Sequence, residues 1–219
     1  MEIPRRATIV FQGDSITDAS RSYTDDTVLG TGYVMMTAAW FSAKYLEYKV
    51  TFLNRGISGN RIRDLKDRWK TDCLDLKPDV VSILIGINDI LGRYFWNTPT
   101  SNDGFERDYR SILEQTRSCL KAQIVLLEPF LLNVTGERSK LREYLNPKIE
   151  IVRKIAKEFN TTIIPLDYIF NEAARVRHGS FWSIDGIHPT LAGHALIAQS
   201  WLNVMSKSHI ESKFHPNNV

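Results

Sequence analysis

The chain has 219 residues, of which 43% are hydrophobic and 24% are charged, and its formal net charge is +3 at pH 7. A chain of this length buries roughly 70% of its unfolded surface, so we expect a single domain over residues 1–219 rather than a disordered or fibrous protein. The small charge and the absence of a basic run argue against nucleic acid as a partner, and no apolar stretch approaches the ~20 residues that span a membrane.

The first predicted element is a buried strand over residues 7–11, followed by a tight turn at Gly13. A serine on such a turn, Ser15, points its hydroxyl out of the carboxyl edge of the sheet. Its N–H faces the same way, toward any anion that forms there. Two interpretations stay open at this point: Ser15 is a catalytic nucleophile, or Asp14 and Ser15 only cap the following helix.

The second predicted strand, residues 50–53, follows a helix predicted over residues 33–48. The strand leads into a segment that contains Gly56 and Gly59. A glycine after a strand offers an N–H that no Cβ shields from a ligand. Gly59 is therefore a candidate oxyanion donor and Gly56 a competing one, with an ordinary turn as the alternative for both.

The third predicted strand, residues 80–85, is followed directly by a segment that contains Asn88. An asparagine amide at a strand end is a neutral donor that can be aimed at a developing oxyanion, where one donor is worth about 10²–10³ in rate. The alternative for Asn88 is a turn residue that bonds its own backbone. Before this strand, residues 61–74 are predicted to form a helix whose alternating basic and acidic side chains are typical of a solvated face.

Aromatic residues near the expected cleft are candidates for substrate binding. Tyr94 and Trp96 lie in a segment predicted as a loop after the third strand, and Trp182 lies shortly before Asp185. Such rings stack on sugars or bind an acyl chain. Packing within the loops and contact between subunits are the alternatives that stay open.

Asp185 and His188 stand three residues apart near the end of the chain. Neutral histidine is the usual base for a hydroxyl nucleophile near pH 7, and it works best when a carboxylate holds its other ring nitrogen. The alternative is an aspartate that caps the last helix, predicted over residues 190–205. Within that helix, His194 is predicted to be an ordinary helix-face residue.

The remaining elements complete an alternation of strands and helices. Strands are predicted over residues 123–127 and 162–166, and helices over residues 105–120 and 138–159, the second broken near Pro147. This order predicts an α/β fold with a parallel sheet covered by helices on both faces. Ligands of such sheets bind at the carboxyl ends of the strands, which is where the polar motifs fall.

With these motifs in this order, the chain resembles the SGNH (GDSL-type) hydrolases. The matching blocks are Gly13-Asp14-Ser15, Ile57-Ser58-Gly59-Asn60, Gly86-Ile87-Asn88-Asp89 and Asp185-Gly186-Ile187-His188-Pro189. The resemblance implies a three-layer α/β/α fold with a five-stranded parallel sheet in a flavodoxin-like order. It implies Ser15 as the nucleophile and His188 as the base, oriented by Asp185. The implied oxyanion hole consists of Ser15, Gly59 and Asn88, and we expect neither a metal ion nor an organic cofactor.

Within the family, residues 30–33 and 183–189 look most like the acetylxylan-esterase branch. This branch implies a small acylated substrate and the removal of acetyl groups from xylo-oligosaccharides. The candidate substrate-binding residues are Asp14, Tyr94, Trp96 and Trp182. Three alternatives stay open: a lysophospholipase or thioesterase, a non-catalytic carbohydrate-binding module, and a metal-dependent phosphoesterase that uses Asp14, Asp18 and Asp89.

The expected location is cytoplasmic, because residues 1–6 lead into the first strand without the apolar core of a signal peptide. Cys73 and Cys119 are the two cysteines and lie far apart in sequence, so no disulfide is needed. The polar tail over residues 206–219 is expected either to hang loose or to grip a neighbouring subunit, which leaves homo-oligomerisation open.

Overall fold

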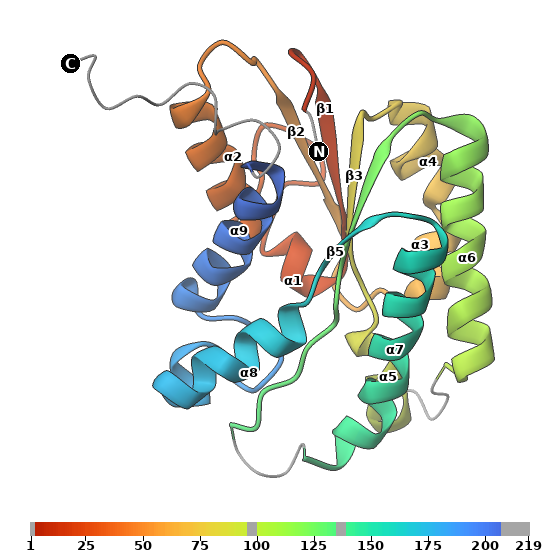
Figure 1. Cartoon of the computed structure of the whole chain (residues 1–219), viewed down its shortest axis with the longest axis vertical. Helices are drawn as coiled ribbons and strands as arrows, with labels where there is room; N and C mark the ends of the chain where they lie inside the picture. The colour runs from red at the N-terminus through yellow and green to blue at the C-terminus, as the bar shows by residue number, and fades with distance from the viewer. Residues whose placement is uncertain (1–2, 96–99, 135–138, 207–219) are drawn as a thin grey trace.

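The computed structural model describes residues 3–95, 100–134 and 139–206. At its centre lies one sheet of parallel strands in the order β2-β1-β3-β4-β5. The strands are β1 (Thr8–Gly13), β2 (Thr51–Gly56), β3 (Val80–Leu84), β4 (Gln123–Leu127) and β5 (Thr162–Ile164). Helices cover both faces of the sheet (Figure 1). The predicted three-layer α/β/α fold with a flavodoxin-like strand order is confirmed.

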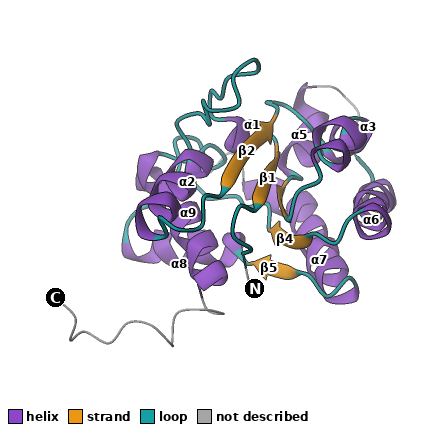
Figure 2. Cartoon of the chain, turned by 90° about the horizontal axis from the view of Figure 1, so that it is seen from above, coloured by secondary structure: helices purple, strands orange, loops and turns teal. Residues whose placement is uncertain are grey.

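The helices divide between the two faces of the sheet. They are α1 (Ser15–Asp18), α2 (Tyr33–Lys44), α3 (Ile62–Asp67), α4 (Trp69–Asp72), α5 (Ile87–Phe95), α6 (Asn102–Cys119), α7 (Arg142–Glu158), α8 (Leu166–Val176) and α9 (Leu191–Ser206). Helices α2, α8 and α9 lie on one face, and α3, α6 and α7 lie on the other, as Figure 2 shows from above. Each face therefore encloses its own layer of apolar side chains against the strands.

The centre of the sheet is apolar on both sides because helices cover both sides. All five residues of β3 are buried, a pattern typical of a strand inside a parallel sheet. The polar exception is Ser82, whose Oγ accepts a hydrogen bond of 3.1 Å from the indole Nε1 of Trp201 in α9. This bond satisfies two buried polar groups at once and fixes α9 against the sheet.

The prediction of one continuous helix over residues 61–74 is wrong, because the segment is divided into α3 and α4. Arg68 lies between them with φ −102° and ψ 5°, outside the helical region. Its side chain turns inward toward the end of β1, so the predicted solvated face is also wrong at this residue. The helix predicted over residues 33–48 ends four residues early, at Lys44.

The predicted break near Pro147 is wrong, since α7 runs through this residue. A proline inside a helix costs about 3 kcal/mol, because one backbone hydrogen bond is lost. Leu145, Ile149 and Val152, on either side of the proline, are at most 3% exposed. Burial of each such side chain contributes about 1.5–3 kcal/mol, so together they outweigh the cost of the proline.

Two helices, α5 and α8, are absent from the elements predicted above. Gly86 (φ +128°) makes the turn after β3, and α5 begins directly after it at Ile87. The segment predicted as a ring-rich loop is thus helical up to Phe95, and Trp96 lies outside the described residues. Helix α8 begins at Leu166, which the prediction assigned to the last strand.

Candidate active site

The turn after β1 places Ser15 at the first position of α1. Asp14 is the residue before the helix, and its Oδ1 accepts a hydrogen bond of 3.0 Å from the Ile16 N–H. A Cβ at Gly13 would lie 2.4 Å from the Leu84 carbonyl oxygen, so only glycine fits this turn beside β3. The capping interpretation therefore holds for Asp14, while the Ser15 side chain stays free to point away from the sheet.

Ser15, His188 and Asp185 form a continuous hydrogen-bonded line. The Ser15 Oγ lies 3.1 Å from the His188 Nε2, and the His188 Nδ1 lies 3.0 Å from the Asp185 Oδ2. Ser15 and His188 are 173 positions apart in the chain. The structure thus brings together the three residues predicted as nucleophile, base and orienting carboxylate.

Asp185 stays ionised because several donors converge on it. Its Oδ1 accepts backbone N–H bonds of 2.9 Å from Ile187 and 2.8 Å from His188. Burial raises the pKa of Asp185, but the His188 ring and these two N–H groups outweigh it and hold the pKa well below its usual value. Because a carboxylate only accepts, the His188 Nδ1 must carry the proton, which leaves Nε2 to accept from Ser15.

Gly59 and Asn88 present donors beside this line. Gly59 is exposed with φ +82°, and its N–H makes no hydrogen bond within the described residues. The Asn88 Nδ2 donates a bond of 3.1 Å to the Asn60 carbonyl oxygen, which orients the amide and leaves its second hydrogen for a ligand. The competing candidate, Gly56, is buried at the end of β2, and its N–H already donates to the Asn54 Oδ1 at 2.9 Å.

Arg68 ties the nucleophile turn to the segment that carries Gly59. Its guanidinium donates a hydrogen bond of 3.0 Å to the Gln12 Oε1 and another of 3.2 Å to the Gly13 carbonyl oxygen. It also donates a hydrogen bond of 2.8 Å to the Asn60 Oδ1 and forms an ion pair of 2.9 Å with Asp72. Burial lowers the pKa of Arg68, an effect that the Asp72 carboxylate opposes. This role of Arg68 does not follow from the sequence, because alternating charges predict a solvated face.

Arg68→Met is expected to destabilise the protein by about 3 kcal/mol, because it leaves the partly buried Asp72 carboxylate without its cation. The midpoint of thermal unfolding should then fall by roughly 6–12 °C. The matched change Lys70→Met removes an ion pair with Asp75 whose lysine side chain is 76% exposed, and it should cost no more than about 0.5 kcal/mol. Equal melting temperatures for the two variants would contradict this role of Arg68.

His194 is more than a helix-face residue. Its Nδ1 accepts a hydrogen bond of 3.1 Å from the Tyr33 N–H, the first free donor of α2. Burial, together with the nearby His188, lowers the pKa of His194 to about 4. His194 therefore stays neutral near pH 7 and serves as a cap that links α9 to α2.

The predicted substrate-binding residues differ in where they lie. Asp14 is 1% exposed, and burial raises its pKa to about 7, so its position argues against direct contact with substrate. The Trp182 Nε1 donates to the carbonyl oxygens of Ala173 and Arg177, at 3.1 and 3.0 Å, which supports the packing alternative. Trp96 lies outside the described residues, and the same is true of the Tyr94 side chain.

The three carboxylates of the phosphoesterase alternative do not gather in one place. Asp14 accepts from Ile16, Asp89 accepts from the Ile62 N–H at 3.0 Å, and Asp18 accepts from the Ser58 N–H at 3.1 Å. No group of three metal-ligating side chains occurs in the part of the chain that the structure describes. Likewise, no helix among the described residues combines the length and the apolar character needed to cross a membrane.

Comparison with known proteins gives concordant matches over nearly the whole chain. Residues 11–196 match the model of the GDSL-like lipase/acylhydrolase family. An acetylxylan esterase from Geobacillus stearothermophilus is 33% identical over 223 residues, which cover 97% of this chain and 100% of that relative. The crystal structure of Axe2, an acetylxylan esterase from the same organism, superposes with a TM-score of 0.86 at 34% identity; the match covers 94% of this chain and 96% of that chain.

Further solved structures agree. A structure from Parabacteroides merdae, provisionally assigned as a GDSL-like lipase, has a TM-score of 0.89 and 36% identity and covers 94% of this chain and 98% of its own. Two structures are described as catalytic mutants of Axe2, one with a histidine and one with an aspartate replaced by alanine, at positions three residues apart. Other Axe2 variants are described as an acetyl-xylooligosaccharide esterase. The chain belongs to the GDSL-like lipase/acylhydrolase family and is a carboxylic ester hydrolase.

Proposed function

We propose that this chain removes acetyl groups from xylose-based oligosaccharides through an acyl-serine intermediate. The observation that carries the proposal is the line from the Ser15 Oγ through the His188 ring to the Asp185 carboxylate, with contacts of 3.1 and 3.0 Å. The substrate is proposed from the similarity to the Geobacillus relative, which is described as an acetylxylan esterase. The aspartate and histidine replaced in its catalytic mutants have the same spacing as Asp185 and His188.

In the first half of the reaction, the His188 Nε2 takes the proton of the Ser15 hydroxyl as the Oγ attacks the ester carbonyl carbon. The carbonyl oxygen becomes an oxyanion, which accepts hydrogen bonds from the N–H groups of Ser15 and Gly59 and from the Asn88 amide. The imidazolium of His188 is stabilised by the ionised Asp185. It then gives its proton to the sugar oxygen, the carbon–oxygen bond of the ester breaks, and acetyl-Ser15 remains.

In the second half, a water molecule replaces the sugar. The His188 Nε2 takes a proton from the water as its oxygen attacks the acetyl carbon. The same three donors hold the second oxyanion. His188 returns the proton to the Ser15 Oγ, the bond from this oxygen to the acetyl carbon breaks, and acetic acid leaves and ionises to acetate, so that the free serine is restored.

Acetate release should identify the substrate class. We expect the protein to release acetate from acetylated xylo-oligosaccharides, and to hydrolyse aryl esters in a rate order that falls from two through four and eight to twelve carbons. Each CH₂ group gains about 0.8 kcal/mol of binding only where apolar surface can cover it. A hollow between α3 and α6, which begins at Arg61, the residue after Asn60, is lined mainly by charged and hydroxyl side chains. The measurement is kcat/KM for each ester, with acetate determined for the oligosaccharides.

Two alternatives predict other outcomes of the same assay. A lysophospholipase or thioesterase should prefer the eight- and twelve-carbon esters. A non-catalytic carbohydrate-binding module should release no acetate and should not react with an organophosphonate that labels activated serines. Several expectations from the sequence stay predictions: the cytoplasmic location, the single domain, and the absence of nucleic-acid and membrane partners. Whether the protein forms a homo-oligomer stays open.

A further inference from the structure

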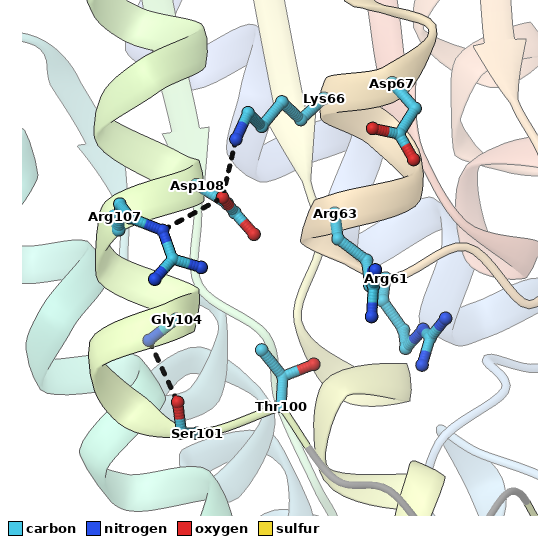
Figure 3. A pocket seen from close by; sticks show the side chains of 9 residues that line it. All are labelled: Arg61, Arg63, Lys66, Asp67, Thr100, Ser101, Gly104, Arg107 and Asp108. Carbon is cyan, nitrogen blue, oxygen red and sulfur yellow. Dashed lines mark hydrogen bonds and ion pairs between the residues drawn. The ribbon is translucent and has the colours of Figure 1, made fainter.

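We propose that a hollow between α3 and α6 binds a carboxylate carried by the acetylated carbohydrate, such as a uronic acid branch. This inference rests on the proposed function and names a substrate class for it. The hollow has a volume of about 370 Å³, within the range of ligand pockets. It is lined by Arg61, Arg63, Lys66, Asp67, Thr100, Ser101, Gly104, Arg107 and Asp108. Figure 3 shows α3 on one side and α6 on the other, with Thr100 and Ser101 at one end.

The lining has more positive than negative charge. Four of its side chains are basic and two are acidic. Asp108 serves two cations at once, since its Oδ1 lies 2.8 Å from the Lys66 Nζ and 3.5 Å from the Arg107 Nε. Arg63 is exposed and makes no hydrogen bond or ion pair within the described residues. The hollow therefore has cationic groups that its own carboxylates do not satisfy.

The hollow begins next to the groups that would hold the oxyanion. Arg61 directly follows Asn60, whose carbonyl oxygen accepts the 3.1 Å bond from the Asn88 amide. At the end of the hollow, the Thr100 N–H donates a bond of 3.1 Å to the carbonyl oxygen of Asp89, the neighbour of Asn88. Two lining residues are thus each one hydrogen bond and one peptide link away from Asn88, and a carbohydrate whose acetyl ester lies at Ser15 reaches the hollow by extending past Asn60.

The chemistry of the lining favours a carboxylate. Arginine presents a planar fork of donors that matches the two oxygens of a carboxylate, and such bidentate bonds are roughly twice as strong as neutral ones. Arg63 and Arg107 supply two such forks from α3 and α6. The Ser101 Oγ accepts the Gly104 N–H at 3.1 Å and keeps its own hydrogen to donate to a sugar, whereas an acyl chain would find no apolar residue in the lining. Among ester substrates, an acidic oligosaccharide fits this lining best.

The test compares two substrates and two variants. One substrate is an acetylated xylo-oligosaccharide with a glucuronic acid branch, and the other is the same molecule with that carboxyl group reduced to an alcohol. The unaltered protein should show a higher kcat/KM for the acidic substrate. The double variant Arg63→Gln/Arg107→Gln should lose about 10-fold in kcat/KM on the acidic substrate and less than about twofold on the reduced one.

The control is Arg175→Gln on α8, on the other face of the sheet. Its side chain is 78% exposed, close to the 72% of Arg107, and its loss should leave the preference for the acidic substrate unchanged. Raising the salt concentration should reduce that preference, since screening weakens exposed charge pairs. Inorganic phosphate should compete with the acidic substrate more than with the reduced one.

The inference is overturned if the unaltered protein treats both carbohydrates alike, or if the double variant loses the same factor on both. Tight binding of phosphate without a preference for the acidic substrate would instead indicate a site for a free anion, which also overturns it. In each of these cases acetate release from the reduced carbohydrate leaves the proposed function intact. If neither carbohydrate releases acetate while aryl acetate is hydrolysed, the proposed function fails and the inference falls with it.

Discussion

Ser15→Ala should lower the turnover of a short aryl acetate by at least about 10⁴-fold, because no acyl-enzyme can form without the Oγ. What remains should come from substrate binding and the oxyanion donors alone. The fold should persist, because the lost hydrogen bond to His188 lies in an exposed setting and is worth about 1 kcal/mol. The measurements are kcat for the aryl ester and the midpoint of thermal unfolding.

Ser118→Ala is the matched control, since it makes the same chemical change near the end of α6. Among the described residues, the Ser118 Oγ bonds the backbone of its own helix, at Glu114 and Gln115, and contacts the neighbouring Cys119. Its activity should stay within about twofold of the unaltered protein. An organophosphonate should label the unaltered protein and this control at Ser15, and should not label the Ser15 variant. More than about 1% residual activity in Ser15→Ala would remove Ser15 from the role of nucleophile.

Asn88→Ala should lower kcat by about 10²-fold, the loss expected for one oxyanion donor. KM should change little, since the donor acts on charge that develops only in the transition state. Asn88→Asp keeps the size of the side chain but removes the amide hydrogens and adds a negative charge, so its kcat should fall further.

Asn88 also has a structural bond, because its amide donates to the Asn60 carbonyl oxygen at 3.1 Å. The effect of losing this bond must be separated from the effect of losing an oxyanion donor. If that structural bond were its whole contribution, Asn88→Ala would lower thermal stability and leave kcat within threefold. Such a result would return Asn88 to the class of turn residues. A large loss in kcat at nearly constant stability supports the donor.

The proposed reacting groups could be predicted from the sequence because each lies in a short block. Three of the blocks follow β1, β2 and β3, and the fourth lies in the segment before α9. Asp185 and His188 contact each other through local turn geometry, which three residues are enough to specify. The distance of 173 positions between Ser15 and His188 is closed by the sheet rather than by the blocks themselves. The carboxyl ends of parallel strands share one edge, which predicts that the blocks after β1, β2 and β3 lie together, whereas the meeting of Ser15 with His188 was expected from the family resemblance.

The supporting residues could not be predicted in this way, because their partners are set only by tertiary packing. Arg68 lies in a run of alternating charges, and nothing local separates it from Arg63, which does face solvent. Its partners Gln12 and Gly13 are 56 and 55 positions away. The hollow has the same origin, because Arg63 and Arg107 come from separate helices that only packing brings to one cavity.

Helix α8 was missed for a different reason. The apolar residues Leu166, Ile169 and Phe170 follow helical spacing, and all three pack into the core on the α2 side. Leu166 also continues the apolar run of β5, so a short window assigns it to the strand. Pro165 marks the boundary, as the residue that precedes the helix.

Nearly half of the His188 side chain is open to solvent, and among the described residues no heavy atom other than those of its chain neighbours lies within 4 Å of where a Cβ on Gly59 would stand. The proposed reacting groups thus lie in an exposed site at the surface rather than at the bottom of a deep pocket. A large molecule can present an ester from its flank, without threading an end into the protein. Acetyl groups in the interior of an oligomer are then as accessible as those at its termini, and selectivity depends on what flanks the ester rather than on how long the molecule is.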